Sequence, residues 1–200
     1  MTTLTLGRHV FPDVSFTGGP EDLEGLIDSY PEPLRGYLRQ HNGWIALGGA
    51  LHVRGGCVEP GWHSISRARP TLKRLYTLEA RDLCFAQDGL GNQFVLRAGR
   101  VWRLAAETGR WHDAGVDLDG FFAAALADPD RWLGRHHLRG LRLAPGHLAL
   151  AYPPLCTEEA RAGVSMKAVA ADEVIAFHGH LAAQLKDLPA GAAIRFKVTD

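Results

Sequence analysis

The sequence has few cysteines and no excess of charge of either sign. Its 200 residues include three cysteines, Cys57, Cys84 and Cys156, and no C-x-x-C pair. An odd number of widely spaced cysteines excludes a disulfide framework or a zinc knuckle and is typical of reduced cytoplasmic thiols. Lysine plus arginine number 22, and aspartate plus glutamate also number 22. This neutral balance argues against a dedicated nucleic-acid binder, because neutralising phosphates requires a basic excess.

Long apolar runs are also missing. No stretch of about 18 consecutive apolar residues occurs, so we expect no transmembrane helix and no membrane partner. Residues 1–8 lack the basic segment and apolar block of a secretory signal, so we expect a cytoplasmic location. The hydrophobic content of 46% excludes a mainly disordered chain. The length predicts one domain, with room for an appendage.

The common catalytic motifs are absent. The sequence contains no phosphate-binding P-loop, no nucleophile elbow of the G-x-S-x-G type and no H-E-x-x-H zinc motif. The segment Gly89-Leu90-Gly91 lacks the third glycine of a dinucleotide-binding loop, and its context predicts a hairpin. We therefore predict no cofactor and no enzymatic activity.

Histidine and cysteine positions do not predict a metal site. His178 and His180 are two residues apart on an expected helix, about 200° around its axis, so they cannot share one metal ion. The other candidate set is Cys57 with His52 and His63, and a cysteine with a histidine six residues later is a weak signal. We predict that no metal is bound.

Hydrophobic periodicity predicts an α+β fold: an antiparallel β-meander with helices packed around it. Period-two segments joined by tight glycine-containing turns run from Asp82 to Trp111 and form the meander. Before it we expect an irregular segment over residues 1–19, helices starting at Pro20 and Pro33, and short strands over 44–53. After it, Asp117 caps an amphipathic helix with apolar residues at Leu118, Phe121, Phe122, Ala125 and Leu126.

Residues 136–200 are predicted to form a smaller C-terminal extension, which packs on the rest of the chain so that the two parts make one compact unit. Its pattern predicts a hairpin of 141–144 with 147–152, a helix over 172–187 and a terminal strand over 193–198.

The neutral total conceals blocks of opposite sign. Residues 1–60, 61–110, 111–130, 131–150 and 151–200 carry net charges of −3, +5, −5, +4 and −1. Such blocks can pair within the chain or present separate faces to partners. Arginine outnumbers lysine 18 to 4, and arginine suits forked pairing at interfaces.

Candidate partner- or ligand-binding residues come from aromatic, polar and basic positions near turns. Tryptophans serve both cores and binding surfaces, and the two roles remain open for each of them. The candidates are Trp44, Trp62, His63, Asp88, Asn92, Trp111, Arg135 and Arg139.

Four segments in order resemble the SUKH superfamily, which includes the yeast cell-wall-assembly regulator and killer-toxin-resistance proteins. The segment Tyr30–Leu38 with His41-Asn42-Gly43-Trp44 resembles its opening helix and Asn-Gly turn, and residues 83–96 resemble its central hairpin. Residues 101–110 and 118–134 are similar to its next strand and closing helix.

The resemblance covers about residues 15–135 and has two departures. Arg97 replaces the final acid of the hairpin motif, and Pro33 is a second proline in the opening segment. The resemblance implies a single α+β domain over 15–135 without catalytic chemistry, with 136–200 outside the common core. It also implies a protein partner: bacterial members are taken to be immunity proteins that neutralise toxins, and eukaryotic members are interaction modules.

Two other functions remain open from the residues. One is an enzyme or small-ligand binder that uses a cleft between the meander and residues 136–200, with His63, Asp88 and Asn92 as first candidates. The other is a constitutive regulatory or scaffold module.

Overall fold

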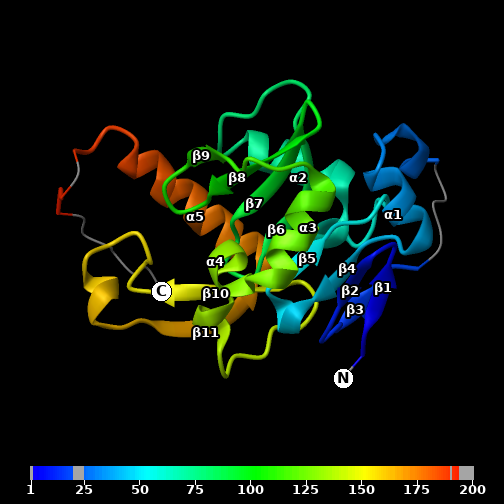
Figure 1. Ribbon diagram of the computed structural model, residues 1–200. Helices are drawn as coiled ribbons and strands as arrows, with labels where there is room; N and C mark the ends of the chain where they lie inside the picture. Colours follow the sequence, from blue (N-terminus) through cyan, green and yellow to red (C-terminus); the bar gives the residue numbers. More distant parts are fainter. Residues whose placement is uncertain (1, 20–24, 190, 194–200) are drawn as a thin grey trace.

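The centre of the molecule is a seven-stranded antiparallel sheet (Figure 1). The computed structural model describes residues 2–19, 25–189 and 191–193. Each strand pairs with the next along the chain, which is the predicted meander, extended at its N-terminal side by short strands. The strands are β3 (Phe16–Thr17), β4 (Trp44–Ala46), β5 (Leu51–Val53), β6 (Leu83–Asp88), β7 (Gln93–Arg97), β8 (Arg100–Ala105) and β9 (Arg110–Asp113).

Among the described residues, five α-helices and five short 3-10 helices accompany this sheet. The helices are α1 (Leu34–Gln40), α2 (Ile65–Lys73), α3 (Leu118–Ala127), α4 (Pro129–Leu133) and α5 (Ala171–Leu185). The 3-10 helices are η1 (Ile27–Ser29), η2 (Leu47–Gly49), η3 (Gly61–His63), η4 (Arg135–Leu138) and η5 (Glu159–Ala162). The α+β class is therefore confirmed, and Asp117 caps α3 as predicted, accepting a hydrogen bond from the Gly120 amide. No helix among the described residues is long and apolar enough to cross a membrane.

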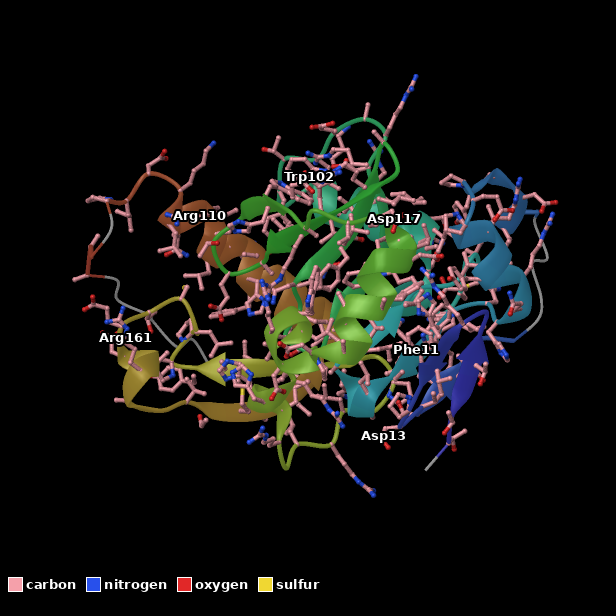
Figure 2. The ribbon with its side chains drawn as sticks, in the orientation of Figure 1. Phe11, Asp13, Trp102, Arg110, Asp117 and Arg161 are labelled. Carbon is pink, nitrogen blue, oxygen red and sulfur yellow. The ribbon has the colours of Figure 1, made fainter. Side chains whose placement is uncertain are left out.

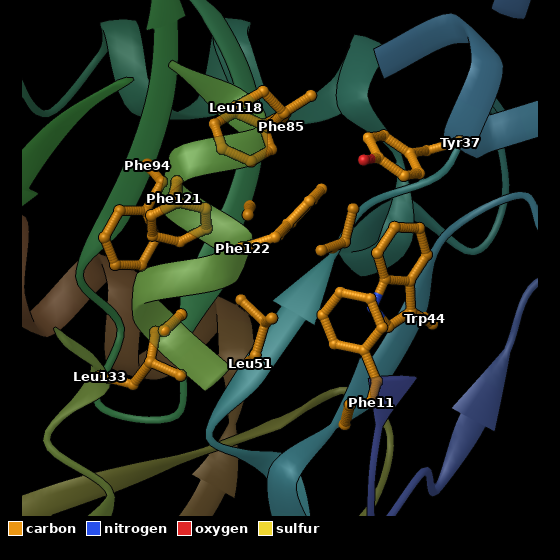
Figure 3. Packing of buried hydrophobic residues seen from close by; sticks show 14 of the residues in the cluster. Phe11, Tyr37, Trp44, Leu51, Phe85, Phe94, Leu118, Phe121, Phe122 and Leu133 are labelled. Carbon is orange, nitrogen blue, oxygen red and sulfur yellow. The ribbon is translucent and has the colours of Figure 1, made fainter. Parts of the chain in front are cut away.

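One face of the sheet carries the larger core. Alternate residues of the strands point to this face, where α3 and the N-terminal strands cover them. Figure 3 shows the aromatic side chains of α3, Phe121 and Phe122, between Phe94 of the meander and Trp44 of β4. The predicted apolar stripe of α3 is thus buried, and it holds the helix on the sheet.

The opposite face is covered by α2 and α5. Cys84, Val95 and Leu104 point to this side and contact Leu72 of α2 and Val174 of α5 within a second apolar cluster. A continuous polar group lies on the same face, closer to β5, and is described with the candidate site.

The prediction of an irregular segment over residues 1–19 was wrong. Strands β1 (Leu4–Leu6) and β2 (His9–Phe11) form an antiparallel hairpin around Gly7, whose φ is +57°. Leu6 of β1 and Phe11 of β2 are fully buried. Strands of three residues form few hydrogen bonds with each other, so these core contacts stabilise the hairpin.

The C-terminal extension is a hairpin followed by a helix, but its strand pairing differs from the prediction. Strand β10 (His147–Tyr152) pairs with β11 (Ser165–Ala170), and 141–144 form no strand. Leu143 instead packs into the main core, and this apolar contact holds the segment away from β10. Helix α5 is confirmed, whereas the predicted strand over 193–198 and the start of the helix at Pro20 fall outside the described residues.

Candidate functional site

A groove of about 470 Å³ lies where three segments from different parts of the chain meet. The turn η2, the junction of α3 with α4, and the chain from η4 to Leu141 form its walls. It is lined by Leu47, Gly48, Ala127, Asp128, Pro129, Asp130, Arg135, Leu138, Arg139, Gly140 and Leu141. Two of the predicted binding residues, Arg135 and Arg139, therefore line the same groove.

The backbone on one side of the groove is held in a rare conformation. Leu47 and Gly48 have φ of +57° and +69°, and Asp13 beside them has φ of +52°. The Leu47 amide donates to the Pro12 carbonyl at 2.9 Å, and the Gly48 amide donates to the Asp13 carbonyl at 3.2 Å. A left-handed conformation costs a non-glycine residue about 1 kcal/mol or more, and such strain concentrates at functional sites. Two strained residues side by side favour this groove as the functional site.

Ion pairs connect the charged residues of the groove. The Arg135 guanidinium donates to the Asp13 carboxylate at 3.2 Å, and Arg139 donates to Asp130 at 3.4 Å. Figure 2 shows Asp13 at the edge of the molecule beside β2. Asp128 accepts a hydrogen bond from the Arg131 amide and caps α4.

The charge blocks of the sequence are partly joined here. The pair of Arg139 with Asp130 links the basic block 131–150 to the acidic block 111–130, whereas Arg135 pairs with Asp13 far away in the sequence. Arg131 and Arg142 are exposed and form no ion pair among the described residues. Arg131 and Arg142 therefore carry charge without an ion pair at the positions that follow Asp130 and Leu141 of the lining.

A second polar group is fully buried against β5 and β6. Arg54 donates to the Gln87 side-chain oxygen at 2.7 Å, so the Gln87 amide nitrogen faces and donates to His52 Nδ1 at 3.1 Å. His52 Nε2 then donates to His63 Nδ1 at 2.9 Å, and His63 Nε2 donates to the Asn42 carbonyl at 2.8 Å. Because an arginine offers donors only, it fixes the direction of this whole chain of hydrogen bonds and keeps both histidines neutral.

The pKa values agree with that assignment. Burial holds the pKa of His63 at about 4, and it holds the pKa of His52 well below its ordinary value, with the Arg54 charge adding to the effect. Burial also lowers the pKa of Arg54 to about 10, which still leaves it charged near neutral pH. The group joins β5, β6, η3 and the Asn42-Gly43 turn, so its role is to fix these elements relative to one another.

Asp88 and Asn92 build the turn between β6 and β7. The Asp88 carboxylate accepts from the Leu90 and Asn92 amides at 3.0 and 2.9 Å and from the Asn92 side chain at 2.8 Å. Asn92 in turn accepts from the Ala106 amide at 3.0 Å. Burial raises the pKa of Asp88 to about 6, opposed by Arg103 at 3.7 Å and by these hydrogen bonds. Both side chains are therefore engaged within the protein.

The three candidate tryptophans have different surroundings. Trp44 is fully buried in the main core, so the expectation that it belongs to a binding surface is corrected: α1, α3 and β2 cover it. Trp62 is partly exposed and lies 5.3 Å from His52 between ring centroids. Trp111 is partly exposed on β9, donates to the Thr77 carbonyl at 3.0 Å and contacts the Arg97 guanidinium. None of them lines the groove.

A crevice of about 10 Å³ lies between the meander and the C-terminal extension at His52 and Gln87. That space is about the size of one water molecule. His63 and Asp88 are buried to within 2% of full burial. No group of three or more histidine, cysteine, aspartate or glutamate side chains is placed to hold a metal ion in the part of the chain that the structure describes.

Sequence reasoning found the two arginines of the groove but missed Asp13, Leu47 and Asp130. The glycine pair after Leu47 indicates an unusual backbone conformation there, and this is a local sequence feature that points to the groove. The pairing of Asp13 with Arg135 spans 122 residues, and no local pattern encodes it.

Comparison with known proteins reveals a distant likeness of fold. No protein-family model matches the chain, and no curated protein matches it. The crystal structure of Atu4351 from Agrobacterium tumefaciens is similar, with a TM-score of 0.56 over 83% of this chain and 85% of that chain. The two sequences are 12% identical, so the likeness shows a shared fold and no more.

Proposed function

We propose that this chain is a non-enzymatic protein-interaction module of the SUKH type, and specifically an immunity protein that binds and neutralises a toxin. The observation that carries the proposal is the groove at Arg135 and Arg139. Its lining combines apolar residues with arginines and aspartates, a mixture that also occurs in protein-binding surfaces.

The four SUKH-like segments supply the second support. They fall on α1 with the Asn42-Gly43 turn, on β6 with β7, on β8 with its following turn, and on α3 with α4. Their polar residues act in the architecture: Asn42 accepts from the Gly56 amide at 2.6 Å, and Asp88 organises the β6–β7 turn. Motif residues with framework roles favour a binding scaffold over a catalyst.

The chemistry of the groove also favours binding. Its lining offers arginine and aspartate side chains in ion pairs, and it includes no histidine, cysteine or serine among the described residues. Aspartate can also act as an acid, a base or a nucleophile, but here Asp130 pairs with Arg139 and Asp128 caps α4, so both carboxylates have partners within the protein.

The test is capture of the product of a toxin-like gene that neighbours the gene for this chain. We expect the purified full chain to retain that product and the double variant Arg135→Glu/Arg139→Glu to retain much less of it. The control is Arg161→Glu, because Figure 2 shows Arg161 at the left edge of the molecule, away from Asp13 at its lower edge. If all three proteins retained the partner equally, the groove would not be its binding site. Absence of any retained toxin-like neighbour would refute the immunity function.

A thermal-shift screen against metabolites, nucleotides and metal ions separates this proposal from the ligand-binding alternative. We expect flat melting temperatures throughout. A reproducible stabilisation by one compound would favour a small-ligand site instead, because a ligand that binds the folded state raises its stability.

A further inference from the structure

We infer that the groove accepts an acidic segment of its protein partner, whose carboxylates replace Asp13 and Asp130 on Arg135 and Arg139. The inference rests on the proposed binding function and adds the chemistry of the partner.

The aspartates of this region are already engaged, whereas two arginines are free to pair. Asp13 and Asp130 accept from arginines, and Asp128 caps α4. Arg131 and Arg142, next to the groove in sequence, are exposed and make no ion pair in the described part of the chain. A partner that brings carboxylates therefore meets two arginines without an ion pair close to the groove in sequence, whereas Asp13 and Asp130 already pair with arginines.

Exchange of carboxylates on the two lining arginines requires little free energy. Arg135 and Asp13 have side-chain exposures of 40% and 25%, and Arg139 and Asp130 have 78% and 47%. Ion pairs at such exposed positions contribute little to stability, because water screens them. A guanidinium binds an incoming carboxylate through two parallel hydrogen bonds, which fixes the orientation of the segment as well as attracting it.

The same surroundings favour a protein segment over a nucleic acid. Leu47 and Leu141 line the groove with apolar surface, which suits the side chains of a peptide and offers nothing to a continuous phosphate backbone. The chain as a whole carries no net positive charge. Nucleic-acid binding depends on neutralising many phosphates at once, and this patch does not provide that excess.

Selection from a phage-displayed random peptide library on the immobilised full chain tests the inference. We expect the enriched peptides to contain clustered Asp and Glu with an apolar residue. Binding of a fluorescein-labelled synthetic copy should weaken about tenfold or more in Arg135→Glu/Arg139→Glu and should weaken with added salt. Arg161→Glu should bind like the wild type.

A gain-of-binding variant makes the test sharper. Asp130→Asn and Asp13→Asn remove the competing carboxylates, and asparagine tolerates the left-handed backbone of residue 13. We expect each to bind the acidic peptide roughly twofold to fivefold more tightly, provided that its melting temperature matches the wild type. A tighter complex cannot result from a partly unfolded variant.

Three results would overturn the inference. In the first, the enriched peptides are basic or neutral, and the double arginine variant no longer binds them. The groove would then be a protein-binding site for a partner of different chemistry. Weaker binding of acidic peptides by both asparagine variants would show that the aspartates help rather than compete. Binding of short single-stranded or duplex DNA that the double arginine variant abolishes would assign the patch to nucleic acid.

Discussion

At the scale of single residues, His52, His63 and His178 act as buried neutral groups. His52 and His63 each both donate and accept within a chain of hydrogen bonds that starts at Arg54. His178 is buried in the same way, yet neither of its ring nitrogens has a hydrogen-bond partner among the described residues. Its Nε2 lies 3.8 Å from the Glu107 carboxylate, beyond hydrogen-bond distance.

These histidines predict that the protein loses stability in acid. Burial holds the pKa of His63 and of His178 at about 4, against an ordinary value of 6.5. The unfolded chain therefore binds protons on these rings between pH 6.5 and about 4 while the folded chain does not. Their contribution is fully present above pH 6.5 and is lost as the pH falls toward 4, at about 3 kcal/mol for each ring.

Asp88 acts in the opposite direction within part of that range. Burial raises its pKa from 3.8 to about 6, so its contribution is lost as the pH rises through this window. The stability lost through three buried histidines exceeds the stability gained through one carboxyl group. Urea unfolding at a series of pH values should therefore show a net decrease in the free energy of unfolding below pH 6.5. A free energy of unfolding that rises on acidification from 6.5 would contradict this account.

The substitution His178→Leu isolates one of these rings. It removes two polar atoms that have no described partner, so we expect the free energy of unfolding near neutral pH to change by less than about 1 kcal/mol. It should also reduce the loss of stability in acid. His63→Leu is the comparison, because it leaves the His52 and Asn42 groups without their partner and should cost about 1–3 kcal/mol or more.

At the scale of elements, strong local patterns made the meander, α3 and α5 predictable from sequence. The apolar stripe of α3 and the glycine turns between β6 and β9 are local signals, and tertiary packing agrees with them. The hairpin of β1 with β2 was missed because each strand has three residues and its stability comes from distant core contacts. The pairing of β10 with β11 was missed because a long connection, from Pro153 to Val164, separates them.

The candidate site was less predictable than the fold. Arg135 and Arg139 stood out as part of a basic block, but the same reasoning selected Asp88 and Asn92, which organise a turn, and Trp44, which is in the core. A sequence pattern identifies a residue with binding chemistry without showing whether that chemistry is already satisfied within the fold.

The Asn42-Gly43 turn gives a prediction at this scale. Gly43 has φ of +82°, and a Cβ there would lie 2.4 Å from His63 Cε1 and 2.7 Å from the Arg54 carbonyl carbon. Gly99 has a similar φ of +79° with open space around it. We expect Gly99→Ala to cost about 1 kcal/mol from backbone strain alone and Gly43→Ala to cost clearly more, measured by urea unfolding. Equal losses would show that close packing at Gly43 is unimportant.

At the scale of the whole molecule, zero net charge results from blocks of opposite sign that the fold only partly pairs. The acidic and basic blocks meet at Asp130 and Arg139, and the basic block also reaches the N-terminal segment through Arg135 and Asp13. The same meeting point contains the groove and its strained backbone. A molecule with balanced charge and a partly unpaired basic segment over residues 131–142 suits a protein that recognises another protein selectively.

The most direct test of this account is to map the contact surface by amide hydrogen exchange. The full chain would be measured alone and with the captured toxin-like partner. The account predicts slower exchange over residues 47–49 and 128–142, and unchanged exchange at the outer strand β9 (Arg110–Asp113). Protection confined to β9 or to β11, with the groove unchanged, would contradict the central claim that this groove is the binding site.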